Sequence, residues 1–288
     1  MLCRLFGKSR TAWYKQQKSI YRKVIKQSEV LSIVSQLRKK MPRIGTRKLH
    51  YILQNQGFDI GRDALFKLLR NHNMLVRRRR TRIFTTQSSH WLRKYPNIIN
   101  DLIIYRPNQL WVSDITYVKS KEGHRYLFLL TDAYSRKILG YKLCEDMQAD
   151  NAVSVLKMAL AKLKKSENGL IHHSDRGIQY CSTKYVNLLK ANTIRISMTE
   201  NGDPLENAIA ERVNGILKDE WLYNIETMKT KLLKSFIGRI IEIYNSDRPH
   251  LSIDMLTPNE AHKVQGKLKR KWKNYYNCKV KEKTLINQ

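Results

Sequence analysis

Three acidic residues, Asp114, Asp175 and Glu211, have positions in the sequence that suggest chemistry. Asp114 interrupts a β-rich stretch, Asp175 ends a short apolar one, and Glu211 follows after thirty-five intervening residues. A buried carboxylate is costly and neighbouring carboxylates repel one another, so such a cluster needs hard cations to neutralise it. Two Mg²⁺ ions held in this way stabilise both the attacking and the leaving oxygen of a phosphodiester displacement. The three acids therefore suggest metal-assisted chemistry on a nucleic acid backbone.

The third acid lies in a predicted helix, Leu205–Glu220. Asn207, Asn214 and Lys218 share one helical face with Glu211, because residues three, four or seven apart lie above one another. A single glutamate on a helix most often faces solvent, so this helix alone does not identify a site. Glu211 becomes a candidate site residue because two aspartates upstream could share a site with it. Three other acids in or shortly before this helix are alternatives to Glu211: Glu200, Asp203 and Glu206.

The elements around these acids alternate between strand and helix. In order, we expect strands Gln109–Val118, Arg125–Ser135 and Lys137–Glu145, helix Asp150–Leu163, strand Gly169–Asp175, helix Thr183–Ala191, strand Ile194–Met198, and helices Leu205–Glu220 and Lys229–Asn245. Three strands in a meander followed by alternating elements predict an α/β fold, a mixed five-stranded sheet with flanking helices. With right-handed crossovers, the strands of Asp114 and Asp175 lie side by side, and the Glu211 helix crosses near their ends.

Other polar residues in this region have simpler interpretations. No His or Cys spacing suggests zinc, and we expect His172 and His173 to serve packing or local hydrogen bonding, with a role on the substrate side as the alternative. Asp132, on the second strand, is expected to be structural or to support the site from behind. The four cysteines have neither paired metal spacing nor a disulfide framework, which is typical of reduced thiols.

Charge is distributed unevenly along the 288 residues. The net charge is +31 with a pI of about 10.1, which indicates a polyanionic partner. Residues 1–100 contain 24 basic and 3 acidic side chains, residues 101–265 contain 23 and 20, and residues 266–288 contain 8 and 1. This segregation is expected of a protein that binds phosphates through its terminal regions and uses acidic residues for chemistry in its central region.

The basic N-terminal third predicts a DNA-binding domain. After a basic lead-in, residues 1–27, we expect three short helices within residues 28–76, with helix starts at Ser28, Thr46 and Asp63. Two short helices with a basic final face are typical of a helix-turn-helix. Residues 77–104 form a basic linker, the catalytic region spans residues 105–265, and residues 266–288 form a basic tail.

The termini and the hydropathy pattern exclude two locations. The N-terminus lacks the apolar core of a secretory signal, and no apolar run is long enough to span a membrane. We therefore expect a cytoplasmic protein.

Four motifs together resemble the DDE transposases of bacterial insertion sequences, whose catalytic core is of the retroviral-integrase, RNase H-like type. The matching residues run from Trp111 through Asp114 to Tyr117, from His173 through Asp175 to Tyr180, from Asn207 to Glu211, and from Tyr244-Asn245 through Arg248-Pro249-His250 to Thr257-Pro258. The thirty-five-residue gap resembles the D,D(35)E pattern, and Lys218 matches its basic companion. Two positions depart from the usual pattern without removing an acid: Glu206 and Arg212.

The resemblance implies a mechanism and partners. Asp114, Asp175 and Glu211 would be catalytic and would hold two Mg²⁺ ions, with Mn²⁺ able to substitute. The protein would cleave the 3′ ends of an insertion sequence in double-stranded DNA and join them to a target, as a homo-oligomer associated with the bacterial nucleoid. A fusion to an upstream reading frame is also implied. We expect DNA contacts from these side chains: Lys218, Asn207, Arg47, Lys67, Arg70, Arg77, Arg78, Arg79, Arg80 and Arg248.

Two other functions remain open at the level of sequence. A structure-selective nuclease would need the same three acids, although the helix-turn-helix favours a transposase. A DNA-binding regulator with an inactive core would be expected to have lost one acid, and this chain has all three.

Overall fold

A computed structural model describes residue 7 and residues 9–77, 91–100, 102–163, 169–200 and 207–271. The chain divides into two compact units, Met1–Arg78 and Arg79–Gln288. No helix in the described ranges is long and apolar enough to cross a membrane.

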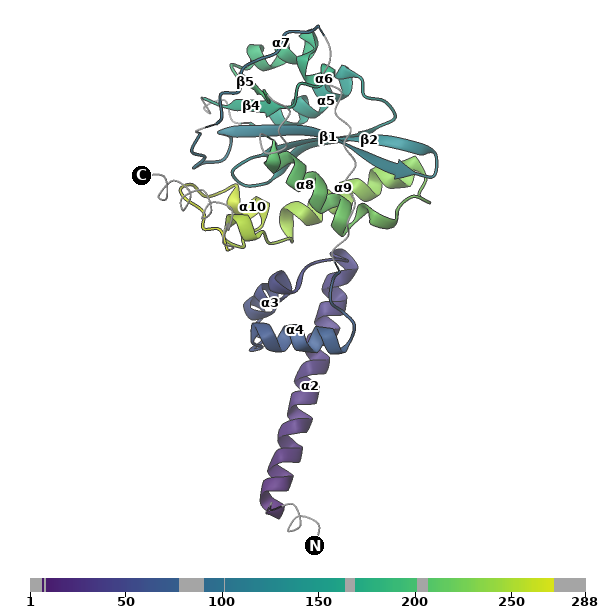
Figure 1. Ribbon diagram of the computed structural model, residues 1–288, viewed down its shortest axis with the longest axis vertical. Helices are drawn as coiled ribbons and strands as arrows, with labels where there is room; N and C mark the ends of the chain where they lie inside the picture. The colour runs from purple at the N-terminus through teal and green to yellow at the C-terminus, as the bar shows by residue number, and fades with distance from the viewer. Residues whose placement is uncertain are drawn as a thin grey trace, which may run out of the picture. The chain divides into compact units, whose positions relative to one another are not determined.

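The first unit consists of one long helix and two short ones (Figure 1). Helix α2 runs from Arg10–Lys40, α3 from Thr46–Asn55 and α4 from Arg62–Asn71. Apolar side chains from all three helices and the connecting turn form a small core, including Val30, Val34, Met41, Ile44, Leu49, Leu53, Leu65, Leu68 and Leu69. Because α2 contributes only its second half to this core, the side chains of residues 10–26 are exposed.

The predicted helix starts in this unit are wrong in detail. Ser28 lies inside α2, where its hydroxyl donates to the carbonyl of Ile25, so α2 crosses the expected boundary between residues 27 and 28. Thr46 and Asp63 lie within the first turns of α3 and α4, and glycines precede both helices. Periodicity identified the buried faces, but the helix-favouring lead-in continues α2 towards the N-terminus.

The second unit contains the expected mixed five-stranded sheet. Its strands are β1 Leu110–Ser120, β2 Gly123–Asp132, β3 Ile138–Cys144, β4 Ile171–Ser174 and β5 Arg195–Met198, arranged in the order β3-β2-β1-β4-β5. Strands β1, β2 and β3 are antiparallel neighbours, whereas β4 pairs in parallel with β1 and β5 in parallel with β4. This arrangement confirms the predicted fold class.

Helices cover both faces of this sheet (Figure 1). Helices α5 Ala149–Leu160, α6 Ile178–Cys181 and α7 Thr183–Ala191 lie on one face. Helices α8 Ala208–Glu220 and α9 Thr230–Ser246 lie on the other. The chain then continues through α10 Pro258–Ala261, and two 3₁₀ turns, η1 Leu222–Asn224 and η2 Leu251–Ile253, connect the last helices.

Helix α8 begins three residues later than the sequence predicts. Asn207 precedes it with φ −120° and ψ 28°, which is not a helical conformation, and Ala208 is the first helical residue. Glu211 therefore lies in the first turn of α8 and not in its middle. This placement brings the acid close to the positive end of the helix dipole, which favours a carboxylate.

Residues that the sequence assigned to a linker form part of the second unit. Pro96 accepts a hydrogen bond from the amide of Met198 at 3.4 Å, and the amide of Ile98 donates to the Ser197 hydroxyl at 3.1 Å. Ile98, Ile99, Leu102 and Ile104 then pack beside Leu110, Val112, Ile171 and Ala210. We call residues 96–100 and 102–104 the strap.

Two glycines provide a matched test of how closely α5 packs on β3. A Cβ at Gly140 in β3 would lie 2.4 Å from the Val155 carbonyl of α5, whereas a Cβ at Gly215 in α8 would meet nothing within 4 Å. We expect Gly140→Ala to lower the free energy of unfolding by about 2 kcal/mol or more through overpacking. Gly215→Ala should raise it by about 0.5–1 kcal/mol because alanine is the better helix former. Urea unfolding measures both, and equal effects would contradict the close α5–β3 contact.

Candidate active site

The pairing of β1 with β4 brings the two aspartates to the same level of the sheet. Trp111 lies opposite His172 and Val112 opposite His173 in a parallel register. Asp114 follows two residues after Val112, and Asp175 follows directly after β4. The predicted neighbourhood of these strands is therefore confirmed.

Asp114 is held by two hydrogen bonds. One carboxylate oxygen accepts from the Ile115 amide at 2.8 Å, and the other accepts from the Asn214 side chain of α8 at 2.7 Å. Asn214 is buried, and the sequence showed it only as a neighbour of Glu211 on the helical face. Its role as a partner of Asp114 required the docking of α8 on β1, which no local pattern encodes.

Asp175 is positioned by the turn that follows β4. Its Oδ1 accepts from the Gly177 amide at 3.1 Å. A Cβ at residue 177 would lie 3.0 Å from that oxygen and 3.1 Å from Gln179 Oε1, so only glycine fits without displacing either group. Gly177 and the buried Gln179 belong to the motif around Asp175, and their supporting role becomes visible only in the turn.

Contacts along α8 position Glu211. Before the helix, Asn207 Nδ2 donates to the Ser113 carbonyl at 3.1 Å. In the middle, Asn214 reaches Asp114. At the end, Glu220 forms a bidentate ion pair with Arg248, with oxygen–nitrogen distances of 2.6 and 2.8 Å. The helix is therefore held at three levels against β1 and the segment after α9.

The prediction that Arg248 contacts DNA is not supported by its position. Its side chain is 2% exposed, and it binds Glu220 and the ring nitrogen of His250. The guanidinium also lies over the Tyr244 ring at 5.8 Å. Arg248 and His250 thus serve structure, because removing one partner of a buried ion pair leaves an uncompensated charge and costs about 3–5 kcal/mol.

Asp175 and Glu211 both lie near enough to Asp114 to affect its pKa. Burial, followed by the charge of Asp175, raises the pKa of Asp114 from 3.8 to about 7, and Glu211 adds a smaller increase. The hydrogen bonds from Asn214 and Ile115 oppose this rise. Desolvation lowers the pKa of Lys218, and the nearby charges of Asp114 and Asp219 oppose this shift.

The side chains do not form a closed metal cage on their own. Among the described residues, no group of three or more His, Cys, Asp and Glu side chains has a geometry that could hold a metal ion. The donor chemistry nevertheless fits one, because hard divalent cations prefer oxygen ligands. A cation would also relieve the repulsion that raises the pKa of Asp114.

Behind the acids lies a buried polar network. His172 Nε2 lies 2.8 Å from both the Ser113 hydroxyl and the Tyr185 hydroxyl, and burial lowers the pKa of His172 to about 3. His173 Nδ1 lies 2.8 Å from the Ser197 hydroxyl. The histidines therefore join neighbouring elements, as their expected packing role requires.

Asp132 has a structural role, which is one of the two roles that the sequence suggested for it. Its carboxylate accepts from the Ser135 amide and hydroxyl, both at 2.7 Å, and from the Asn108 amide at 2.7 Å. The three donors tie the β2–β3 turn to the start of β1.

Most of the expected DNA-contacting side chains that the structure describes are exposed. Arg47, Lys67, Arg70, Arg77 and Lys218 are exposed, whereas Asn207 is buried. Several expected residues lie outside the described ranges, namely Arg78, Arg79, Arg80 and, among the rival acids, Asp203 and Glu206. The third rival, Glu200, accepts a hydrogen bond from the Asn97 amide at 2.8 Å and so supports the strap.

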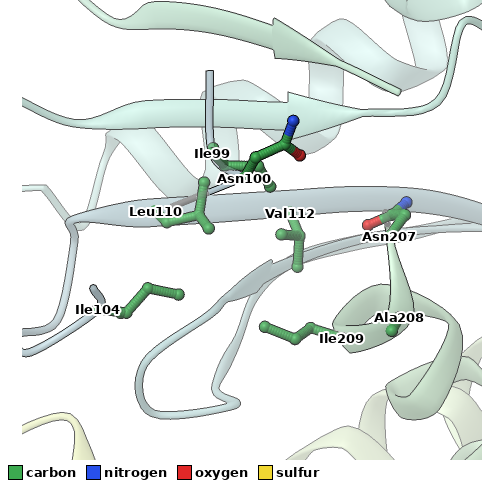
Figure 2. Close-up of a pocket in the computed structure, with 8 residues that line it drawn as sticks. All are labelled: Ile99, Asn100, Ile104, Leu110, Val112, Asn207, Ala208 and Ile209. Carbon is green, nitrogen blue, oxygen red and sulfur yellow. The ribbon is translucent and has the colours of Figure 1, made fainter. Parts of the chain in front are cut away.

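A pocket of about 210 Å³ lies in the second unit. Figure 2 shows its lining, which comes from the strap, from β1 and from the start of α8: Ile99, Asn100, Ile104, Leu110, Val112, Asn207, Ala208 and Ile209. The pocket includes none of the three acids.

Comparison with known proteins identifies the family. Two models of the integrase core domain match residues 104–204 and 192–258. A 31 kDa protein of insertion element IS600 from Shigella sonnei is 34% identical over 262 residues, covering 89% of this chain and 96% of that protein. The chain belongs to the DDE transposases of bacterial insertion sequences. The InsF transposase of insertion sequence IS3A from Escherichia coli K12 is 28% identical to this transposase over 265 residues. These residues cover 90% of this transposase and 92% of InsF.

Solved integrase cores are more distant from this transposase. The HTLV-2 integrase catalytic core, solved in complex with magnesium, matches 55% of the transposase and 97% of that chain, with 19% identity and a TM-score of 0.43. An integrase-type core implies dependence on a divalent metal, and the donor set at Asp114 is compatible with one.

The raised pKa of Asp114 predicts how stability depends on pH. The folded state binds this proton more tightly than the unfolded state, so the ionised carboxylate destabilises the metal-free fold as pH rises from about 4 to 7. A pKa change from 3.8 to about 7 corresponds to at most about 4 kcal/mol. We expect Asp114→Asn to raise the free energy of unfolding at pH 8, and the gain to disappear near pH 4. Urea unfolding in a chelator measures the difference.

The amide of Asn214 allows this substitution without removing a hydrogen bond. Its Oδ1 has no hydrogen-bond partner among the described residues, so a flipped Asn214 amide can accept from the NH₂ group that Asp114→Asn introduces. Asp219→Asn, at an exposed position of the same helix, is the control and should change the free energy of unfolding by less than about 0.5 kcal/mol at both pH values. A less stable Asp114→Asn protein at pH 8 would contradict the electrostatic interpretation.

Proposed function

We propose that this transposase cleaves the 3′ ends of an insertion sequence and joins them to target DNA. The observation that supports the proposal is the parallel pairing of β1 with β4, which brings Asp114 and Asp175 to the same level of the sheet, with Glu211 near enough to affect the pKa of Asp114. A protein of net charge +31 that nevertheless gathers acids at one point is suited to act on a phosphate backbone.

In this proposal the three carboxylates hold two Mg²⁺ ions, and Mn²⁺ can replace them. The metal would activate the attacking oxygen and stabilise the leaving oxygen in both cleavage and joining. Asn214 and the Ile115 amide keep Asp114 oriented, Gly177 leaves room for the Asp175 carboxylate, and the contacts of α8 present Glu211. Lys218 would bind a phosphate of the DNA that lies against this helix.

DNA recognition is proposed for the first unit and the basic segment that follows it. Exposed residues of α3 and α4 would contact the terminal repeats, with Lys67 and Arg70 directed to bases and Arg47 to the backbone. Arg77–Arg80 would track phosphates. Since two ends must be joined, we propose a homo-oligomer on double-stranded DNA in the nucleoid, with an upstream reading-frame product as its fusion partner.

The first test of this proposal removes the carboxylates one at a time. Asp114→Asn, Asp175→Asn and Glu211→Gln should each reduce Mg²⁺-dependent cleavage and joining by about three orders of magnitude or more, because metal and charge stabilisation contribute several kcal/mol to the barrier. Binding to the terminal repeat should persist. The assay uses labelled repeat DNA and a supercoiled target.

Controls separate this function from a simple nuclease. Asp219→Asn, an exposed acid on the same helix, should retain full activity. Cleavage without any joined product would favour the structure-selective nuclease. Joining at wild-type level by any of the three variants would refute the assignment of that residue.

The basic segment makes a separate prediction. Arg77→Gln combined with Arg78→Gln should reduce the slope of log affinity against log salt by about 0.9 for each phosphate that the variant no longer neutralises. Lys157→Gln combined with Lys190→Gln is a matched control, because these exposed lysines lie on α5 and α7, across the sheet from α8. Equal slopes in the two double variants would contradict the phosphate-tracking role.

A further inference from the structure

A buried hydrogen-bond network connects the strands that carry the two aspartates. Its centre is His172 of β4, whose Nε2 lies 2.8 Å from the Ser113 hydroxyl on β1 and 2.8 Å from the Tyr185 hydroxyl on α7. Ser113 and Tyr185 also form a hydrogen bond with each other. All three residues are at most 2% exposed, so the network is closed to solvent. We call Ser113, His172 and Tyr185 the hub.

The hub lies on the face of the sheet that is turned away from Asp114. Ser113 comes directly before Asp114 in β1, and successive side chains of a strand point to opposite faces. The position of Tyr185 agrees with this placement, because α7 covers the face opposite α8 (Figure 1). Any effect of the hub on the acids must therefore pass through the backbone that carries them.

The backbone pairing of β1 with β4 ends just before the acids. Val112 and His173 form the last pair, and both aspartates lie two residues beyond them. Beyond this point, the relative position of the two strands is not fixed by their own ladder. The contact between Ser113 and His172 supplies a side-chain link between the strands at this boundary.

Ser113 also reaches the helix of the third acid. Its carbonyl accepts a hydrogen bond from Nδ2 of Asn207 at 3.1 Å, and Asn207 directly precedes the turn of α8 that contains Glu211. The side chain of Ser113 thus contacts β4 while its main chain contacts α8. A displacement of Ser113 would move Asp114, the next residue in the chain, together with the start of α8.

The hub acts through position and not through charge. Burial lowers the pKa of His172 to about 3, so the ring is neutral near pH 7. One ring nitrogen completes a full hydrogen bond with only one hydroxyl at a time, and the bond between Ser113 and Tyr185 satisfies the other. Loss of any member leaves a buried polar group unsatisfied, so the three positions are fixed together.

We propose that His172 is a positioning residue of the transposase. Through Ser113 and Tyr185 it fixes β1 relative to β4 and α8, and it thereby sets the arrangement of the carboxylates that receive a divalent cation. This inference rests on the proposed function. Residues that orient metal ligands without touching the metal change metal affinity by about 10–100-fold when they are replaced.

The test measures metal affinity directly and does not depend on activity. Full-length transposase without DNA is titrated with Mn²⁺ near neutral pH, and free Mn²⁺ is quantified by electron paramagnetic resonance. Tyr185→Phe and Ser113→Ala each remove one hydroxyl of the hub, and each should weaken Mn²⁺ binding about tenfold. Because both hydroxyls act through one ring nitrogen, the double variant should also lose about tenfold and not about a hundredfold.

Matched variants elsewhere in the same unit are the controls. Tyr244→Phe removes a buried hydroxyl that donates to the Arg136 carbonyl at 3.1 Å. Ser120→Ala removes a buried hydroxyl that donates to the Gly123 carbonyl at 2.8 Å, at the far end of β1. Both should bind Mn²⁺ within about twofold of the wild type, whereas Asp114→Asn should lose binding. Urea unfolding identifies the variants that are folded.

The outcomes separate the hub from the function. Wild-type affinity in Tyr185→Phe and Ser113→Ala, with Asp114→Asn deficient, refutes the hub and leaves the proposed function standing; either hub variant decides alone if the other does not fold. Equal weakening in Tyr244→Phe and Ser120→Ala also refutes the hub, because the loss would not be specific to it. If Asp114→Asn binds Mn²⁺ as well as the wild type does, the acids do not hold the metal, and the proposed function fails together with the hub.

Discussion

The parallel pairing of β1 with β4 is the constraint on which the rest of the site depends. It brings Asp114 and Asp175, sixty-one positions apart in the sequence, to the same level on neighbouring strands. Parallel strands need a crossover connection, here from β3 through α5, and its fixed handedness leaves the opposite face of the sheet open for α8. The third acid can therefore approach only from the face that α8 covers.

Bringing three carboxylates together is unfavourable, and contacts from residues that take no part in the reaction offset this cost. Asn207, Asn214 and the Glu220–Arg248 pair hold α8 before its first turn, in its middle and at its end. Burial, and after it the charge of Asp175, still raises the pKa of Asp114, so these contacts do not fully offset the cost of its negative charge. A site in this state is favourable for a divalent cation, because the cation replaces repulsion between the acids with attraction to each of them.

The strap, which precedes β1, has a structural role that the sequence did not predict. Its composition indicated a linker, yet its apolar residues complete the core between β1 and α8 and form one wall of the pocket. The same few residues thus stabilise the Glu211 helix and shape a pocket next to its start.

The sequence by itself determined the fold class and the order of the elements, because alternating and helical periodicities are local properties. It also singled out Asp114, Asp175 and Glu211 as candidates, through a spacing that resembles a family pattern. It misplaced Ser28 as a helix start and assigned Arg248 to DNA, because neither the continuation of α2 nor the burial of an arginine against Glu220 follows from neighbouring residues. Only the tertiary structure decided which amides support the acids, where α8 begins and that a pocket lies beside the strap. These features arise where segments far apart in the chain pack together, so no local pattern carries them.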